Sequence, residues 1–215
     1  MNAPTHHPEP DELIAYAAGT SPEWVSLVVA CHLTYCPECR DNVSLFEDLG
    51  GALLDSMDDT AGAPPRPNFD VARVLAAPAS ETQPVAAVAG IPRPLSAYFQ
   101  DSPPRWRFLI PGLRHLPLNF SVGGIPARII RFKPGFTIPE HRHEALEMLL
   151  VLDGELEDGV THELFRSGDL SRREPGTTHS QHILGPEPCT CLVVSAGPVT
   201  PSSWLGRILK AVTGV

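Results

Sequence analysis

The chain has 215 residues, of which 42% are hydrophobic and 24 are proline, and its formal net charge is −9. This length is enough for one large domain or two small ones, each with a buried core. No apolar run approaches the roughly 20 residues of a membrane-spanning helix, and the first residues lack the basic-then-apolar layout of a secretory signal. We therefore expect a cytoplasmic protein without a membrane contact.

The negative charge is concentrated near the N-terminus. Residues 1–60 contain eleven acidic side chains and one basic side chain, Arg40, whereas the rest of the chain is close to neutral. An acidic module repels nucleic acid and attracts a basic protein surface, including the surface of a DNA-binding protein. The alternative interpretation is a solvated face that keeps the protein in solution.

Residues 1–77 predict a small helical module. Proline and acidic residues stand at the expected helix starts, and apolar side chains recur at helical spacing. Asn68 is suited to cap a short last helix. The expected helices cover residues 10–18, 21–32, 36–57 and 68–75.

A metal-binding pattern lies between the second and third predicted helices. His32 is followed at metal-ligand spacing by Cys36 and Cys39, and two thiols at a helix start can share one ion because the helix dipole favours their deprotonated form. His6 or His7, ahead of the first helix, would complete a tetrahedral site of two cysteines and two histidines, for which zinc is the natural ion. A dithiol redox pair is the alternative, but the strand-to-helix unit typical of such pairs is absent.

Residues 78–97, rich in Ala and Pro, predict an interdomain linker. From residue 98 to residue 215 the sequence consists of short β-type runs separated by turns, a pattern typical of an antiparallel sandwich or barrel. A short helix is expected at residues 203–209. Strands are expected at residues 106–110, 113–120, 127–132, 146–152, 163–166 and 191–194.

A second metal-binding pattern lies in this β-rich part. His141 and His143 alternate along an extended segment, so both side chains point to the same face of a strand, and Glu147 can join them inside a small barrel. His179, after a Pro-Gly turn at the start of another strand, is the fourth candidate, with His182 as the fallback. Three imidazoles and one carboxylate suit zinc, iron, manganese or nickel.

The remaining cysteines have two interpretations each. An odd number of cysteines without a secretory signal does not predict a disulfide framework. Cys31 is either a competing ligand beside the first metal-binding pattern or a buried apolar side chain. Cys189 and Cys191 would face the same side of a strand, where they could report oxidation or be ordinary buried cysteines.

Both halves resemble one bacterial family, the ChrR-type zinc-binding anti-sigma factors. The N-terminal part resembles their anti-sigma domain through its upstream histidine and its His-x3-Cys-x2-Cys signature. The spacing from residues 16–19 back to the histidine pair favours His7 over His6.

The C-terminal part resembles a cupin. The match to the first cupin motif, G-x5-H-x-H-x3-E-x6-G, has no mismatch and consists of Gly135, His141, His143, Glu147 and Gly154. The second motif is looser, because Ile183 stands where an asparagine is common after the histidine that corresponds to His179.

The resemblance implies a negative regulator of transcription and not an enzyme. Its helical module would bind and inhibit an extracytoplasmic-function sigma factor, and its cupin would sense singlet oxygen or organic hydroperoxide in a stress response. It implies zinc at two sites, formed by His7, His32, Cys36 and Cys39 and by His141, His143, Glu147 and His179.

Two other functions compete with this one. A cupin metalloenzyme, such as a small-molecule dioxygenase with an accessory helical module, uses the same ligand set. A DNA-binding zinc finger is disfavoured because the helical module has no basic face. The sequence as a whole predicts an α+β multidomain protein, in which an all-α zinc-binding module of four helices is followed by an antiparallel β cupin barrel.

Overall fold

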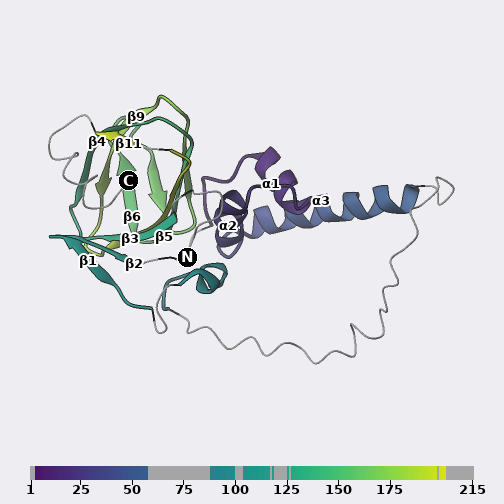
Figure 1. Ribbon diagram of the computed structural model, residues 1–215, viewed down its shortest axis with the longest axis horizontal. Coiled ribbons are helices and arrows are strands. Elements are labelled where there is room, and N and C mark those ends of the chain that lie inside the picture. The colour runs from purple at the N-terminus through teal and green to yellow at the C-terminus, as the bar shows by residue number, and fades with distance from the viewer. Residues whose placement is uncertain are drawn as a thin grey trace.

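The computed structural model of the protein describes residues 3–57, 88–99, 104–116, 118, 125, 127–197 and 199–201. A helical N-terminal part packs against one sheet of an antiparallel two-sheet barrel, and its last helix projects away from the barrel into solvent (Figure 1). No helix in these ranges is long and apolar enough to cross a membrane.

The helices begin and end at local sequence signals. α1 and α3 have a proline in the first turn, where its missing N–H leaves no hydrogen bond unmade. The helical regions expected at residues 10–18, 21–32 and 36–57 are present, whereas those at residues 68–75 and 203–209 lie outside the described residues. The α-helices of the described ranges are α1 (Pro10–Ala17), α2 (Glu23–His32) and α3 (Pro37–Ser56).

The described end of the expected linker is ordered structure that packs on the helices. Residues Arg93–Tyr98 form a 3-10 helix, η1. Leu95 in η1 is fully buried, and the Tyr98 hydroxyl donates a 2.9 Å hydrogen bond to the Glu23 carboxylate at the start of α2. This segment has the composition of a linker, but the buried side chain of Leu95 belongs to the apolar core that it shares with the helices.

All strands of the barrel pair antiparallel. One sheet has the order β1-β2-β3-β10-β5-β8, and the other has the order β11-β4-β9-β6-β7. The expected strand at 127–132 has the bounds of β3. The strands β6, β8 and β11 were not predicted from the sequence; all three are short, and β6 and β8 are largely polar. The strands are β1 (Arg107–Ile110), β2 (Leu113–Leu116), β3 (Ala127–Phe132), β4 (Thr137–His143), β5 (Glu147–Asp153), β6 (Glu155–Asp158), β7 (Leu164–Arg166), β8 (Leu170–Arg173), β9 (Thr178–Ile183), β10 (Cys189–Ser195) and β11 (Val199–Pro201).

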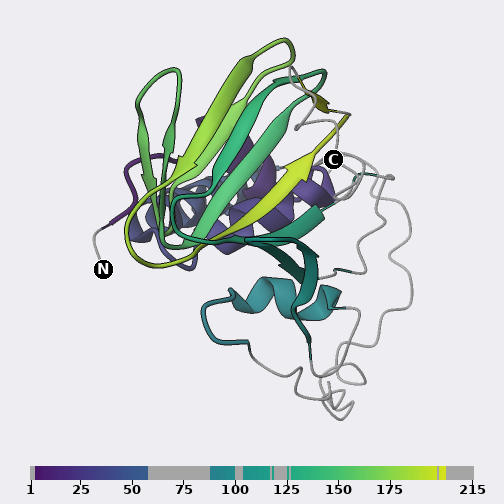
Figure 2. The same ribbon diagram turned by 90° about the vertical axis from the view of Figure 1, so that its left-hand side faces the viewer.

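Two apolar clusters hold the molecule together, one on each side of the six-stranded sheet. The first lies inside the barrel and includes Val151 and Leu156. The second joins the outer face of this sheet to the helices and includes Val28, Leu150 and Leu192. Figure 2 shows the helices behind this sheet. Because both of their faces are covered, β5 and β10 are continuous apolar runs with little polar alternation.

Candidate metal centres

The first cluster of ligand-type side chains, here called the helical cluster, consists of His7, His32, Cys36 and Cys39. Both thiols lie at the start of α3, where the Cys36 sulfur accepts a hydrogen bond from the Cys39 N–H. His32 ends α2, and the chain returns through a tight turn to Cys36, whose N–H donates to the His32 carbonyl at 3.1 Å. The local fold therefore gathers three ligand-type side chains within eight residues, and the N-terminal segment supplies a fourth.

The spacing of the helical cluster fits a tetrahedral ion. His7 Nδ1 lies 3.4 Å from the sulfur of Cys36 and 3.4 Å from that of Cys39, and His32 Nε2 lies 3.3 Å from the Cys39 sulfur. A tetrahedral ion with bonds of about 2.0–2.3 Å has ligand–ligand edges of about 3.3–3.8 Å. A neutral imidazole nitrogen has one lone pair and cannot accept hydrogen bonds from both thiols, whereas one shared ion satisfies all the groups.

The protonation states of the helical cluster follow from its burial. Burial lowers the pKa of His32 to about 4, so its imidazole is neutral, which is the form that binds metal. Burial raises the pKa of the Cys39 thiol to about 12, so an incoming ion has to displace its proton. His32 Nδ1 lies 2.8 Å from the carbonyl oxygen of Gly168 and donates to it, which leaves the Nε2 lone pair free for the ion.

The second cluster, here called the barrel cluster, consists of His141, His143, Glu147 and His179. Its ligands come from β4, the first residue of β5, and β9. The Nε2 atoms of His143 and His179 are 2.9 Å apart, and the three imidazole centroids are separated by 4.6–4.9 Å. The 2.9 Å separation is that of a hydrogen bond between the two imidazoles, and it is also close to the roughly 3.0 Å between two ligands at right angles on an ion with bonds of about 2.1 Å.

Burial also sets the charge of the barrel cluster. It lowers the pKa of His143 to about 3 and that of His179 to about 4, and neighbouring positive charges act in the same direction. It raises the pKa of the Glu147 carboxyl to about 8. Without an ion these groups are therefore mostly neutral near pH 7, and a divalent cation supplies the charge that favours the Glu147 carboxylate.

Asp158, at the end of β6, is a site residue that the sequence analysis missed. Its Oδ2 accepts from His179 Nδ1 at 2.8 Å and from the Arg173 guanidinium at 2.8 Å. Burial alone would raise the pKa of Asp158, but backbone N–H groups, His179 and the charge of Arg173 outweigh it and lower the pKa to about 2. The sequence carries no spacing pattern that would predict a contact between Asp158, the last residue of a short polar strand, and a histidine 21 positions later.

The fallback residues lie outside both clusters. His6 packs against the Phe165 ring at 4.4 Å, and its Nδ1 lies 3.6 Å from the Asp169 carboxylate. His182 faces the opposite side of β9 from His179 and lies 3.2 Å from the Thr137 hydroxyl. Cys31 is buried in the apolar cluster between the helices and the sheet.

Cys189 and Cys191 lie on the same side of β10. Their sulfurs are 3.6 Å apart, and both thiols are buried and free. A direct contact between them raises the pKa of Cys191, and burial raises it further. The geometry brings the two thiols together, and the raised pKa of Cys191 keeps that thiol in its less reactive protonated form.

Comparison with known proteins gives three concordant results. The family model described as the ChrR cupin-like domain matches residues 96–200. The anti-sigma-E factor ChrR of Cereibacter sphaeroides is 31% identical over 214 residues, which cover 95% of this chain and 96% of that protein. The crystal structure of Rhodobacter sphaeroides SigE in complex with the anti-sigma ChrR contains a chain 32% identical to this one, with a TM-score of 0.68 over 90% of this chain and 100% of that chain.

These similarities confirm the family resemblance and the fold class that the sequence predicts, with a helical module followed by a cupin barrel. They extend over nearly the whole chain, through both ligand clusters. The protein therefore belongs to the ChrR family of anti-sigma factors.

Proposed function

We propose that this protein binds an extracytoplasmic-function sigma factor through its helical module, inhibits it, and releases it when the cupin senses an oxidant such as singlet oxygen or an organic hydroperoxide. The chain of Rhodobacter sphaeroides that is similar to this one was crystallised with SigE, which supports a sigma factor as the partner.

One observation carries this proposal: α3 presents an uncovered apolar face. Leu45, Leu49 and Leu53 follow one another at four-residue spacing on α3. This helix projects away from the barrel (Figure 1). Each of the three leucines is 58–63% exposed. A row of exposed leucines on a projecting helix is typical of a protein-binding surface and costly for a helix that stays in water.

The charge around this apolar face suits the proposed partner. Acidic side chains, among them Asp41, Glu47 and Asp48, are exposed on the same helix. Sigma factors carry basic surfaces that contact DNA and polymerase, and an acidic rim favours association with such surfaces. The helical module would therefore cover the surface that the sigma factor needs for its own function.

We assign a different role to each metal cluster. In the helical cluster the residues fit zinc, which would tie the N-terminal segment to the junction of α2 and α3. In a module of about 60 residues such an ion stabilises the fold by on the order of 10 kcal/mol. In the barrel cluster, zinc or another divalent ion would hold three oxidisable imidazoles beside Glu147, and this cluster would be the sensor.

The test is copurification of the full chain with candidate sigma factors from its own genome, together with two variants of α3. Leu49→Asp should weaken the complex at least tenfold, because it puts a charge into the apolar contact. Ser44→Asp adds the same charge on the opposite, exposed side of α3 and should leave binding unchanged. Equal binding by both variants would refute the assignment of the leucine face.

The alternative, a cupin dioxygenase, is favoured by one feature of the geometry. The close His143–His179 pair suits a six-coordinate ion, which would have positions open to substrate beyond the four ligands. Iron in the purified protein, with oxygen consumption and no sigma partner, would establish the enzyme and overturn the regulator.

A further inference from the structure

We propose that the β7–β8 turn of the cupin is part of the helical metal centre, because Gly168 and Asp169 position two of its ligands, His32 and His7. Retention of the ion by the helical module would then depend on the cupin. This inference rests on the metal centre of the proposed function and adds to it a physical connection between the two domains.

Gly168 provides the first contact. Its carbonyl oxygen accepts the hydrogen bond of His32 Nδ1 across 136 residues of sequence, in a buried environment. The turn approaches so closely because residue 168 is glycine: its φ is +95°, and a β-carbon there would lie 2.7 Å from both Pro4 and Tyr35. A ligand of the helical centre is therefore oriented by the backbone of the barrel.

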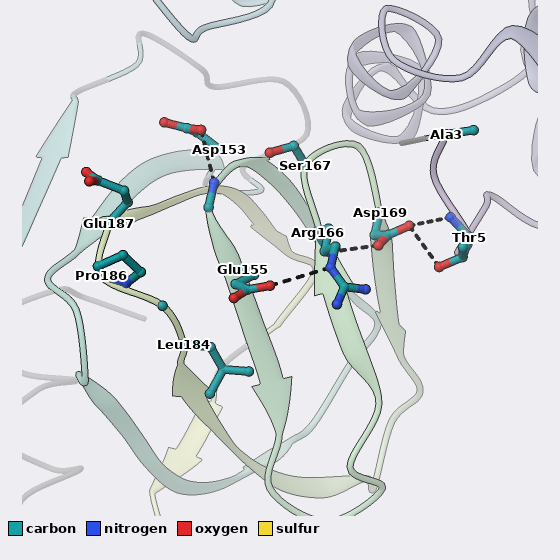
Figure 3. Close-up of a pocket in the computed structure, with 12 residues that line it drawn as sticks. Ala3, Thr5, Asp153, Glu155, Arg166, Ser167, Asp169, Leu184, Pro186 and Glu187 are labelled. Carbon is teal, nitrogen blue, oxygen red and sulfur yellow. Dashed lines mark hydrogen bonds and ion pairs between the residues drawn. The ribbon is translucent and has the colours of Figure 1, made fainter. Parts of the chain in front are cut away.

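Asp169 provides the second contact. Its Oδ1 accepts from the backbone N–H groups of Thr5 at 2.6 Å and His6 at 3.0 Å, and Leu170 N–H donates to the His6 carbonyl at 3.1 Å. Figure 3 shows Asp169 pointing to Thr5 from the wall of a surface hollow of about 440 Å³. The two residues before His7 are thus fixed on the turn, and the position of His7 is fixed with them.

A third contact lies beside the thiols. The Tyr35 hydroxyl donates a 2.9 Å hydrogen bond to the carbonyl oxygen of Leu152 near the end of β5. Tyr35 directly precedes Cys36, so this contact anchors the start of α3 on the sheet. The helical centre is consequently held against the barrel at each of its segments: the N-terminal segment, the end of α2 and the start of α3.

The strands that make these contacts also lead to the barrel cluster. β5 and β8 pair so that Leu150 faces Leu170 at one end and Glu147 faces Arg173 at the other. Arg173 binds Asp158, the residue that holds His179. β8 spans only about 10 Å from Leu170, which follows the turn, to Arg173, which lies beside Glu147. Strands β5 and β8 therefore connect residues around the barrel cluster with the residues that contact the helical centre.

The test uses cobalt(II) added to the metal-free full chain. A thiolate-to-cobalt charge-transfer band reports the helical centre alone, because the barrel cluster contains no sulfur ligand. Asp169→Ala should weaken cobalt binding in chelator competition by about 10–100-fold, the usual effect of removing a residue that orients metal ligands. Asp153→Ala is the matched control: Asp153 lies on the wall of the same hollow, is not among the four side chains of the helical cluster and accepts a hydrogen bond from the N–H of its neighbour Gly154.

Tyr35→Phe provides a second, milder probe, since it removes one hydroxyl and leaves all ligands intact. Circular dichroism identifies any variant that does not fold, and if Asp169→Ala fails to fold, Tyr35→Phe decides: weaker cobalt binding supports the inference, and wild-type binding overturns it. A normal band with wild-type affinity in folded Asp169→Ala would also overturn it while leaving the metal centre intact. Absence of the band in the wild-type protein would overturn the proposed centre and the inference with it.

Discussion

Oδ2 of Asp158 lies 2.8 Å from Nδ1 of His179, so a carboxylate from the neighbouring strand β6 fixes the orientation of a candidate metal ligand. The same oxygen receives the Arg173 guanidinium at 2.8 Å, and the other oxygen accepts two backbone N–H groups of the following turn. Asp158 is therefore held in place and kept ionised, which makes it a positioning residue for the barrel cluster.

Replacing Asp158 with alanine should lower the metal affinity of the barrel cluster by about 10–100-fold, because His179 would lose the acceptor that sets its tautomer. Metal content after dialysis against graded chelator measures this change. Glu157→Ala is the control, since Glu157 pairs with the exposed His162 on the other side of β6. Retention of metal by Asp158→Ala at the wild-type level would show that the barrel orients His179 without it.

The Cys39→Ala variant should lose the ion of the helical cluster and keep that of the barrel cluster. Zinc per chain, determined by elemental analysis, should fall from about two to about one, and the complex with the sigma factor should dissociate. Cys31→Ala should retain both ions, because Cys31 packs in the apolar core eight residues before Cys39. Loss of zinc from Cys31→Ala in a folded protein would assign a ligand role to that thiol.

Glu147 should make a destabilising contribution to the metal-free protein that grows as pH rises. Burial raises the pKa of this carboxyl from 4.5 to about 8, so between these values the folded state keeps a proton that the unfolded chain releases. The contribution of Glu147 to the free energy of unfolding therefore decreases over this range, by on the order of a few kcal/mol, whereas the buried histidines with lowered pKa values act in the opposite direction up to about pH 6.5.

Glu147→Gln removes the titrating group, so the free energy of unfolding of this variant should increase relative to that of the wild type between pH 4.5 and pH 8. Urea denaturation of chelator-treated proteins measures both curves, and the contributions of the buried histidines cancel in the comparison. Parallel curves would mean that the Glu147 carboxyl ionises freely in the folded state.

Glu147→Ala should leave inhibition of the sigma factor intact and reduce its release by oxidant, if the barrel cluster is the sensor. A transcription assay with and without a singlet-oxygen source measures both properties. Glu144→Ala is the matched control, because Glu144 is exposed and pairs with Arg142 at the surface. Loss of inhibition in Glu147→Ala would contradict the division of roles between the two domains.

Leu150→Ala should destabilise the folded protein by about 2–5 kcal/mol, because Leu150 is fully buried between the sheet and the helices. Calorimetry should show the helical part and the barrel unfolding in one shifted transition, since both contribute to this core. Two separate transitions, with only the barrel affected, would show that the two parts are stable independently.

The sequence is informative where the relevant residues are close together in the chain. The ligands around Cys36 and Cys39 lie on adjoining helix ends, and the alternation of His141 and His143 follows from strand geometry alone. The contacts of Asp158, Gly168 and Asp169 depend instead on which turns the fold brings together, and no local pattern records this. The polar strand β8 escaped detection for the same reason, because only pairing with β5 makes it a strand.

The uncovered leucines of α3 also affect how much of this protein a cell can tolerate. A copy without a partner displays the apolar face to every other protein, and such surfaces promote aggregation and recognition by proteases. We expect the lifetime of the protein to depend on the supply of its partner, so that synthesis of the two in matched amounts keeps the chain intact. Pulse-chase measurement of its half-life with and without the sigma factor would reveal this dependence.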